Sequence, residues 1–453
     1  AAKSPVRGCV IIKPYGYEVW EGIKGGLDRR FKETGHQNAY FPLFIPESYL
    51  RREAEHVEGF SPELAIVTIA GGKELEEPLV VRPTSETVIG EAFSEWIQSY
   101  RDLPLLINLW NSVVRWELRT KLFLRTSEFY WQEGHTAHAT AEEAFERTKL
   151  MLDIYTDFAL NEAAVPVIPG EKSENERFAG AERTLTIEAM MGDGKALQSA
   201  TSHYFGQNFA HAFDIQYLDD KGQRQHCWTT SWGFSTRFIG AIIMTHGDDK
   251  GLMMPPRLAP YQVVIVPIFK NDSEQSVVLA AVEQIQQALT AAAVRVKVDL
   301  RDNLSPGYKF NDWELRGVPV RLEIGPRDVE KGTVVVARRD ILGKAGKAFV
   351  PQEGIVERVQ ALLGEIQANM LKRAADFQTT NTQTVADYDG FKTAVETGFA
   401  RAWWAGTSED EERLKGETKA TIRCFPLEQP DGEGVCFYTG RPTKQVAVFG
   451  RSY

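Results

Sequence analysis

The sequence predicts an α+β fold whose first part surrounds an antiparallel sheet and whose later parts form smaller α/β domains. Two observations indicate this architecture. The first 258 residues mix amphipathic helical patterns with β-rich runs that can pair as hairpins, and the sequence from Gln262 onward follows a βαβ pattern. The chain has 453 residues, more than the roughly 250 to 300 at which a single core stops growing, so two or three domains are expected.

The first elements follow from hydrophobic spacing. Residues 17–34 carry an apolar side chain at every fourth position, which predicts an amphipathic helix, and Gly35 suits its C-terminal cap. A strand is predicted over residues 38–45, and the apolar face of residues 85–100 predicts a second helix. The Thr-x-x-Glu box at residues 140–143 is typical of the start of a third.

Later elements define the domain organisation. Short β-type runs fill residues 196–234, and a helix is predicted over residues 235–244. The Pro-rich stretch at residues 253–260 indicates a domain boundary. A strand, a helix and a second strand follow it as a predicted βαβ unit: 262–268, 273–291 and 294–300. We therefore predict three domains: 1–258, 259–355 and 356–453.

Composition excludes some classes of function. No apolar run approaches the ~18 residues of a membrane span, and the first residues lack a signal-peptide pattern, so a cytoplasmic protein without a membrane partner is expected. Four scattered cysteines do not form a disulfide framework. The net charge of −10 argues against indiscriminate polyanion binding, and DNA is not an expected partner.

The most informative segment is a predicted hairpin that carries arginines. Residues 105–114 are β-rich, residues 128–134 form the return strand, and three arginines lie between Arg115 and Phe129. Arginine can bind phosphate bidentately, a carboxylate can accept from an adenine amino group, and a phenyl ring can stack on the base. A charged, solvated hairpin is the alternative reading of such a run alone.

Three motifs then resemble those of the class II aminoacyl-tRNA synthetases. Arg115-x-Glu117, a loop and Arg125-x-x-x-Phe129 resemble motif 2. The helix and strand over residues 22–46 resemble motif 1, through which this class dimerises, so the resemblance implies a homodimer with Pro42 near the interface. The segment 245–260 resembles motif 3, whose arginine would be Arg257.

More specific segments resemble the prolyl-tRNA synthetases of the archaeal and eukaryotic type. They are Arg82-Pro-Thr-Ser-Glu-Thr87, Trp131-Gln-Glu-Gly-His135, Ala200-Thr-Ser-His203 and Thr230-Ser-Trp-Gly-Phe234. The resemblance runs from about Pro5 to Tyr453. It implies a ligase that activates L-proline with ATP and charges tRNA(Pro). Mg²⁺ is the cofactor expected to bind together with the nucleotide.

The resemblance also implies residue roles. Arg115 and Arg257 are the expected catalytic residues, and the ATP-binding set is Arg115, Glu117, Arg125, Phe129, Gln198 and Arg257. The expected proline-binding set is Thr84, Glu86, Arg115, Trp131, Glu133, His135, His203, Ser231 and Gly233. For the Thr-Ser-Glu-Thr cluster at residues 84–87, helix capping is the structural alternative. A lone histidine in a strand is more often a core residue. Glu314, Arg321 and Arg327 are the expected anticodon readers.

The last domain departs from the family pattern. Related chains hold a structural zinc there with four cysteines, but only Cys424 and Cys436 remain, while Ala405, Thr439 and one of residues 409–411 stand at the other ligand positions. We therefore predict no zinc and no other protein-bound metal. The terminal Tyr453 either reaches toward the active site, as the resemblance implies, or belongs to a disordered tail.

Other classes of protein fit this sequence less well. A threonyl-type enzyme would need zinc ligands in its pocket, and the pocket segments offer no Cys/His set beyond His135, His203 and Cys227. A catalytically silent paralogue, acting in RNA binding or regulation, should have lost a motif residue, yet Arg115, Glu117, Phe129 and Arg257 are all present. Walker and Gly-x-Gly-x-x-Gly motifs do not occur. Only 127 residues separate Phe129 in motif 2 from Arg257 in the motif 3 segment, and the predicted strands and helices occupy them, so no inserted editing domain is expected.

Overall fold

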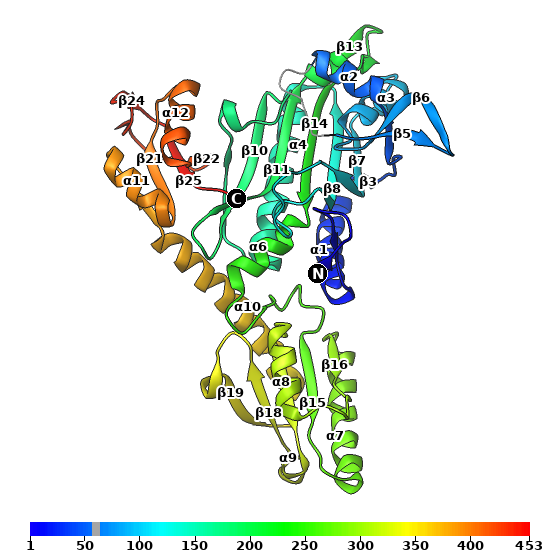
Figure 1. Ribbon diagram of the computed structural model, residues 1–453, viewed down its shortest axis with the longest axis vertical. Helices are drawn as coiled ribbons and strands as arrows, with labels where there is room; N and C mark the ends of the chain where they lie inside the picture. Colours follow the sequence, from blue (N-terminus) through cyan, green and yellow to red (C-terminus); the bar gives the residue numbers. More distant parts are fainter. Residues whose placement is uncertain (57–63) are drawn as a thin grey trace.

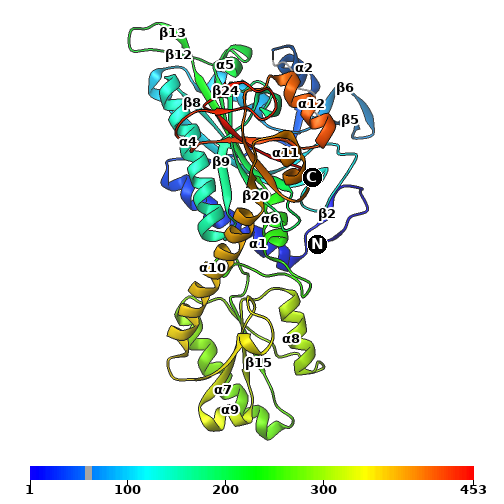
Figure 2. The same ribbon diagram turned by 90° about the vertical axis from the view of Figure 1, so that its left-hand side faces the viewer.

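The computed structural model describes residues 1–56 and 64–453. Its upper part is a large body around a long sheet, and its lower part is a separate α/β domain (Figure 1). Helix α10 (Ile355–Thr380) runs from the lower domain to the C-terminal elements, and a view from the side shows the same bridge (Figure 2). One face of this helix forms a buried apolar stripe, which includes Val359, Ile366 and Met370.

The central sheet follows the predicted antiparallel pattern. Its strand order is β20-β21-β25-β22-β9-β10-β11-β14-β8-β7-β3. The predicted hairpin is confirmed, because β7 and β8 pair from Leu105 opposite Ala137 to Val114 opposite Glu128. The strands of this hairpin and their neighbours are β7 (Leu105–Val114), β8 (Glu128–His138), β9 (Val167–Glu171), β10 (Arg183–Met190), β11 (Ala196–Gly206) and β14 (Trp228–Ser235).

Three helices share one core with this sheet. They are α1 (Pro14–Glu33), α4 (Ala141–Asp157) and α6 (Arg237–His246). The four-residue spacing of the first helix buries Ile23, Leu27 and Phe31 against strand residues such as Trp232. Gly35 has a positive φ of 89°, as a glycine after a helix end should, and the Thr140 side chain accepts from the Glu143 N–H at 3.2 Å.

Two predicted boundaries were wrong. The single strand expected over 38–45 is two short strands, β3 (Gln37–Asn38) and β4 (Phe44–Pro46), which pair in different sheets. Helix α3 (Glu86–Trp96) ends earlier than predicted because Ile97 turns extended, with ψ 114°. Next to it, β4, β5 (Ala65–Ala70) and β6 (Lys73–Val81) form a small sheet beside α2 (Glu47–His56).

The lower domain contains the predicted βαβ unit. Strand β15 pairs in parallel with β16 and β17, and β18 and β19 extend the sheet antiparallel. The strands are β15 (Val263–Pro267), β16 (Val296–Val298), β17 (Val320–Ile324), β18 (Thr333–Arg338) and β19 (Lys347–Pro351). The helices are α7 (Asp272–Ala291), α8 (Pro306–Leu315) and α9 (Pro326–Lys331).

Most C-terminal strands join the central sheet, whereas the two short strands β23 and β24 pair only with each other. Strand β22 (Thr421–Pro426) pairs with β9 through Phe425 opposite Glu171 and Pro426 opposite Gly170. The remaining elements are α11 (Tyr388–Thr397), α12 (Ser408–Thr418), β20 (Thr382–Thr384), β21 (Phe399–Trp403), β23 (Gly434–Val435), β24 (Pro442–Thr443) and β25 (Val446–Gly450). Across the described ranges, no helix is both long and apolar enough to span a membrane.

Candidate active site

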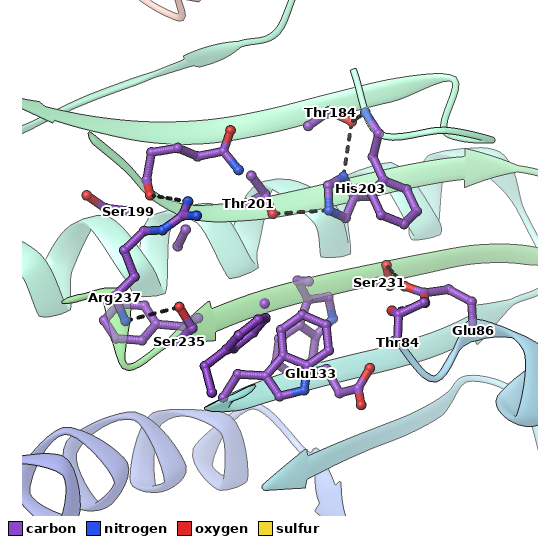
Figure 3. A pocket seen from close by; sticks show the side chains of 18 of the residues that line it. Thr84, Glu86, Glu133, Thr184, Ser199, Thr201, His203, Ser231, Ser235 and Arg237 are labelled. Carbon is purple, nitrogen blue, oxygen red and sulfur yellow. Dashed lines mark hydrogen bonds between the residues drawn. The ribbon is translucent and has the colours of Figure 1, made fainter. Parts of the chain in front are cut away.

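A pocket opens on one face of the central sheet, over strands β8, β11 and β14 (Figure 3). Side chains point the same way at every second position of a strand, so Phe129, Trp131 and Glu133 share one face of β8. The predicted residues that line this pocket are Thr84, Glu86, Arg115, Phe129, Trp131, Glu133, Gln198, His203, Ser231 and Gly233.

Arg115 lies at the inner wall of this first pocket. Its Nε donates to the carbonyl of Pro83 at 3.0 Å, and its guanidinium lies 5.3 Å from the Trp131 ring centre and 5.7 Å from that of Phe129. Burial lowers the pKa of Arg115, while Glu86 and Glu133 act in the opposite direction. An arginine remains charged under this shift, so a fixed cation faces the pocket.

Two carboxylates lie at one end of the pocket. Glu86 accepts from Thr84 and, at 3.2 Å, from the Ser231 hydroxyl. Glu133 accepts from Ser85 Oγ at 2.5 Å and from Asn111 Nδ2 at 3.0 Å. Fixed acceptors of this kind suit a ligand that carries a cationic N–H group.

His135 lies behind Glu133 and is buried. His135 was predicted to bind proline, but it does not line the pocket; it contacts Glu133, which does, and its Nε2 lies 3.1 Å from that carboxylate. Burial opposes charge on both groups, but their pairing prevails: it raises the pKa of His135 and lowers that of Glu133, which Ser85 and Asn111 also stabilise as a carboxylate.

His203 forms an opposite wall as a neutral ring. Thr184 and Thr201 lie at its two nitrogens, at 3.0 and 3.1 Å (Figure 3). Burial lowers the pKa of His203 to about 3, and the positive charges of Arg115 and His135 add to this effect. The Phe178 ring packs on it at 4.5 Å between ring centres, which gives the pocket an apolar side.

A second pocket adjoins the first and shares residues with it. Arg115, Phe129, Glu176, Gln198, Ser235 and Arg237 line both. The second pocket also contains Glu117 and Arg125, whose side chains pair at 2.5 Å. Hydrogen bonds from the Arg119 backbone and the Arg125 side chain lower the pKa of Glu117. The predicted ATP-binding hairpin therefore surrounds one cavity rich in arginine.

The structure corrects the position of the third arginine. Arg257 lies in a different cavity near α10, where Nη1 donates to the Asn161 carbonyl at 3.0 Å. Arg237, the first residue of α6, lines both site pockets and donates to the carbonyls of Leu124 at 3.0 Å and Gln198 at 3.4 Å. Burial lowers the pKa of Arg237 to about 10. The positive charges of the neighbouring arginines lower it as well: Arg115, Arg423 and Arg125.

Arg237 could have been found from the sequence. A β-rich run ends at Phe234 and a predicted helix follows at once, so an arginine in the first turn of that helix enters the space above the strand ends. The resemblance to motif 3 lies instead in the Pro-rich segment that contains Arg257, and this segment leads to the lower domain in the structure.

Other site residues had no signal in the sequence. Glu176 and Phe178 come from the segment between β9 and β10, and Arg423 comes from β22. Tyr453, by contrast, was expected near the active site from the resemblance. It lines the second pocket, where its hydroxyl contacts Asp193 and Lys121 Nζ lies 3.9 Å from its ring centre. These contacts depend on tertiary pairing that no local pattern records.

The C-terminal cysteines lie in two different apolar clusters. Cys424 packs with Met190, Phe399 and Val448, whereas Cys436 packs in the cluster around Phe391. All four cysteines of the chain are described and free. Among the side chains that the structure describes, no group of three or more His, Cys, Asp or Glu residues could hold a metal ion.

Two of the three predicted anticodon residues come together. Glu314 and Arg321 line a pocket in the lower domain with Arg338, Arg339 and Lys347. Arg321 pairs there with Glu323 at 2.9 Å. Arg327 is exposed on α9, after the end of β17, and is not among the residues that line this pocket.

Family models match most of the chain. Residues 67–246 match the tRNA synthetase class II core domain (G, H, P, S and T), residues 262–361 match an anticodon binding domain, and residues 388–453 match the C-terminal part of prolyl-tRNA synthetase. Together with the antiparallel sheet and the arginine-lined site, these matches define a class II aminoacyl-tRNA synthetase, an aminoacyl-tRNA ligase.

Similar proteins narrow the class further. A proline--tRNA ligase of Roseiflexus sp. (strain RS-1) is 60% identical over 449 residues, covering 99% of this chain and 93% of that protein. The chloroplastic/mitochondrial proline--tRNA ligase of Arabidopsis thaliana is 58% identical over 453 residues, covering 99% and 83%. The chain belongs to the prolyl-tRNA synthetases, and a catalytically silent role is not favoured.

A solved structure agrees with this family. The prolyl-tRNA synthetase of Cryptosporidium parvum, solved in complex with halofuginone and AMPPNP, has a TM-score of 0.94 and 41% sequence identity, with 100% of this chain and 94% of that one covered. The class of fold predicted from the sequence is thereby confirmed.

Proposed function

We propose that the protein activates L-proline with ATP, forms prolyl-adenylate with release of pyrophosphate, and transfers proline to the 3′ end of tRNA(Pro). The observation that supports this best is the junction at Arg115, where a pocket with fixed carboxylates meets a pocket rich in arginine. An amino acid held in the first pocket can present its carboxylate at this junction to a phosphate held in the second.

Activation joins two anions, so the site must neutralise their repulsion. Arg115 serves as the catalytic residue that bridges the proline carboxylate and the α-phosphate, because it lines both pockets. Arg125 and Arg237 hold the outer phosphates. The nucleophile is already ionised, so no general base is needed at this step.

The adenosine part of ATP would use the hairpin. Phe129 stacks on the base and Glu117 accepts from its amino group, since both line the second pocket. Gln198 lies on the facing strand β11 and can bind the ribose or a phosphate oxygen. Arg257 is replaced by Arg237 in this proposal.

The proline ring would occupy the first pocket. Its secondary ammonium donates to Glu86 and Thr84, which Ser231 orients, while Trp131 and His203 form walls around the ring. Glu133 completes the acceptor end, and His135 acts behind it by keeping Glu133 ionised. Gly233 leaves space beside Trp131, whose ring carbons lie 3.5 Å from where a Cβ would stand.

The metals differ in how well the residues fit them. Mg²⁺ usually binds phosphates together with one or two carboxylates, and Glu176 is a carboxylate at the junction of the pockets that would hold it. Mg²⁺ supplies charge neutralisation for the phosphates. A structural zinc does not suit the C-terminal part, where Cys424 and Cys436 belong to separate clusters.

The rest of the proposal concerns tRNA and assembly. Residues 1–258 carry catalysis, residues 259–355 read the anticodon through Glu314, Arg321 and Arg327, and residues 356–453 complete the site. The protein acts as a cytoplasmic homodimer, for which the exposed Tyr40, Phe44 and Ile69 near the small sheet offer apolar surface. Proofreading falls to a separate protein.

The test is ATP–pyrophosphate exchange with each amino acid in turn, in the presence of Mg²⁺ and without added zinc. Exchange driven best by proline supports the proposal. Folded protein that exchanges with no amino acid, or better with threonine, contradicts it.

A further inference from the structure

The segment 172–178 belongs to the site but is held from outside it. It connects β9 to β10 and contains only a short turn of helix at Glu174–Glu176. Glu176 lines both pockets, and Phe178 covers the His203 ring in the first. The position of this segment therefore sets the shape of the junction where the two substrates meet.

Helix α12 of the C-terminal part holds one side of the segment. The Ser173 hydroxyl donates to Glu411 at 2.8 Å, and Asn175 Nδ2 donates to the Ser408 carbonyl at 2.9 Å. Glu411 is only 4% exposed, whereas glutamate side chains in proteins are almost never buried unless they are paired. A buried carboxylate that contacts a remote loop is costly unless that contact is made.

Strand β22 holds the other side through a shared carboxylate. Glu188 on β10 is fully buried and accepts from Lys172 Nζ at 2.7 Å and from Arg423 Nε at 3.1 Å. Arg423 also donates to Thr421 Oγ1 at 2.9 Å and lines the second pocket. One carboxylate of the catalytic sheet thus binds the start of the segment and the C-terminal strand together.

The backbone reinforces both contacts. Phe425 pairs with Glu171, the residue before Lys172, so the ladder between β22 and β9 ends where the segment begins. A Cβ at Gly170 would lie 2.6 Å from Cys424, which shows how closely the two strands approach. The segment is therefore fixed at its start by β22 and along its length by α12.

We propose that Glu411 and Arg423 are positioning residues for the substrate pockets: through Ser173 and Glu188 they hold the segment 172–178 so that Glu176 and Phe178 complete the site. This inference rests on the proposed assignment of the pockets to proline and ATP. According to this proposal the C-terminal part contributes directly to substrate affinity, through the side chains of Glu411 and Arg423.

The size of the effect follows from geometry. Glu176 and Phe178 line the pockets, so partial release of the segment should weaken substrate binding by about tenfold, the order that loss of one buried hydrogen bond produces. Removal of one anchor leaves the other in place. We therefore expect a rise in KM and in the dissociation constant of bound ligand, with kcat changed by less than about threefold.

The first test compares Glu411→Leu with Glu412→Leu. Both lie on α12, but Glu412 is exposed and pairs only with Lys415 at 3.4 Å. We measure KM and kcat in proline-dependent exchange, the dissociation constant of a non-hydrolysable prolyl-adenylate analogue by calorimetry, and Tm. Glu411→Leu should raise the KM for proline and the dissociation constant about tenfold, while Glu412→Leu changes neither.

Two further variants keep the inference testable if Glu411→Leu does not fold. Glu411→Gln keeps the acceptor oxygen for Ser173 and should restore wild-type KM, whereas Ser173→Ala removes the donor and should match Glu411→Leu. For the second anchor, Lys172→Met removes the contact of the segment with Glu188 while Arg423 stays in the pocket lining. It should raise the KM for ATP about tenfold, with the exposed Lys372→Met as its control.

The outcomes are separable. A lower Tm with unchanged KM and analogue affinity in Ser173→Ala and Lys172→Met would show a purely structural role and overturn the inference. If the wild-type chain neither exchanges with proline nor binds the analogue, the pocket assignment fails, whatever the variants do.

Discussion

His135 Nε2 and Glu133 Oε2 lie 3.1 Å apart beneath the first pocket, and both side chains are almost completely buried. An ion pair in this place keeps Glu133 ionised toward the pocket while its partner stays out of the pocket lining. The pairing also makes the stability of the fold depend on pH, which leads to the first prediction.

Glu133→Gln should destabilise the protein most at mildly acidic pH. The raised pKa of His135 contributes stability that is complete below its ordinary value of 6.5 and is lost as pH rises through the folded value. The lowered pKa of Glu133 contributes stability that is present above 4.5 and lost below. The difference in free energy of unfolding should therefore be largest between these values, at about 1.5 to 3 kcal/mol.

Thermal unfolding of both forms at pH 5.5 and pH 8.5 checks this prediction. Glu146→Gln is the control, because Glu146 forms an exposed pair with Lys149 that contributes little. An equal loss of stability at both pH values would show that His135 is uncharged in the folded protein.

Arg237→Met should lower kcat/KM for ATP in pyrophosphate exchange by about 10²-fold or more, because a buried donor aimed at phosphate charge is removed. Arg257→Met should change it by less than about threefold, since Arg257 lies in another cavity and donates to the Asn161 carbonyl. The reverse order of these two effects would restore the assignment made from the sequence.

Glu411→Gln should stabilise the protein more at pH 8 than at pH 5. Burial raises the pKa of Glu411 to about 7, with Glu176 and Glu412 adding to the shift and Ser173 and Lys415 opposing it. A raised carboxyl pKa means that stability falls as pH rises from the unfolded value of 4.5 through 7, and glutamine removes that fall. Tm measured against pH for the variant and for Glu412→Gln checks the sign.

Chelation should leave the protein unchanged. EDTA treatment followed by removal of the chelator should not alter Tm, and elemental analysis of the purified chain should find no stoichiometric zinc, because a zinc bound only by the folded state would raise Tm. Stoichiometric zinc, lost together with several degrees of Tm on chelation, would contradict the prediction from Cys424 and Cys436.

Much of the site could be predicted because its signal is local. The alternation along β7 and β8 fixed which side chains of the hairpin face the pocket, and Phe129, Trp131 and Glu133 are found there. The hydrophobic spacing of α1 and the cap at Thr140 are equally local.

The missed features depend on contacts between distant residues. Ser173 and Glu411 are 238 positions apart, and the pairing of Glu171 with Phe425 cannot be read from either strand alone. The sequence indicated Arg257 and not Arg237 for a related reason. Only the path of the chain after α6 shows that Arg237 lines the site pockets and that Arg257 lies in another cavity.

The pairing of β22 with β9 also has a consequence for the integrity of the chain. A strand at the edge of a sheet offers unpaired backbone groups to other molecules, and β22 covers β9 at that position. A protease cut that released the C-terminal part would turn β9 into an open edge. Limited proteolysis between α10 and α11 should then yield a fragment that aggregates. The C-terminal part therefore protects the catalytic sheet from self-association through this edge strand.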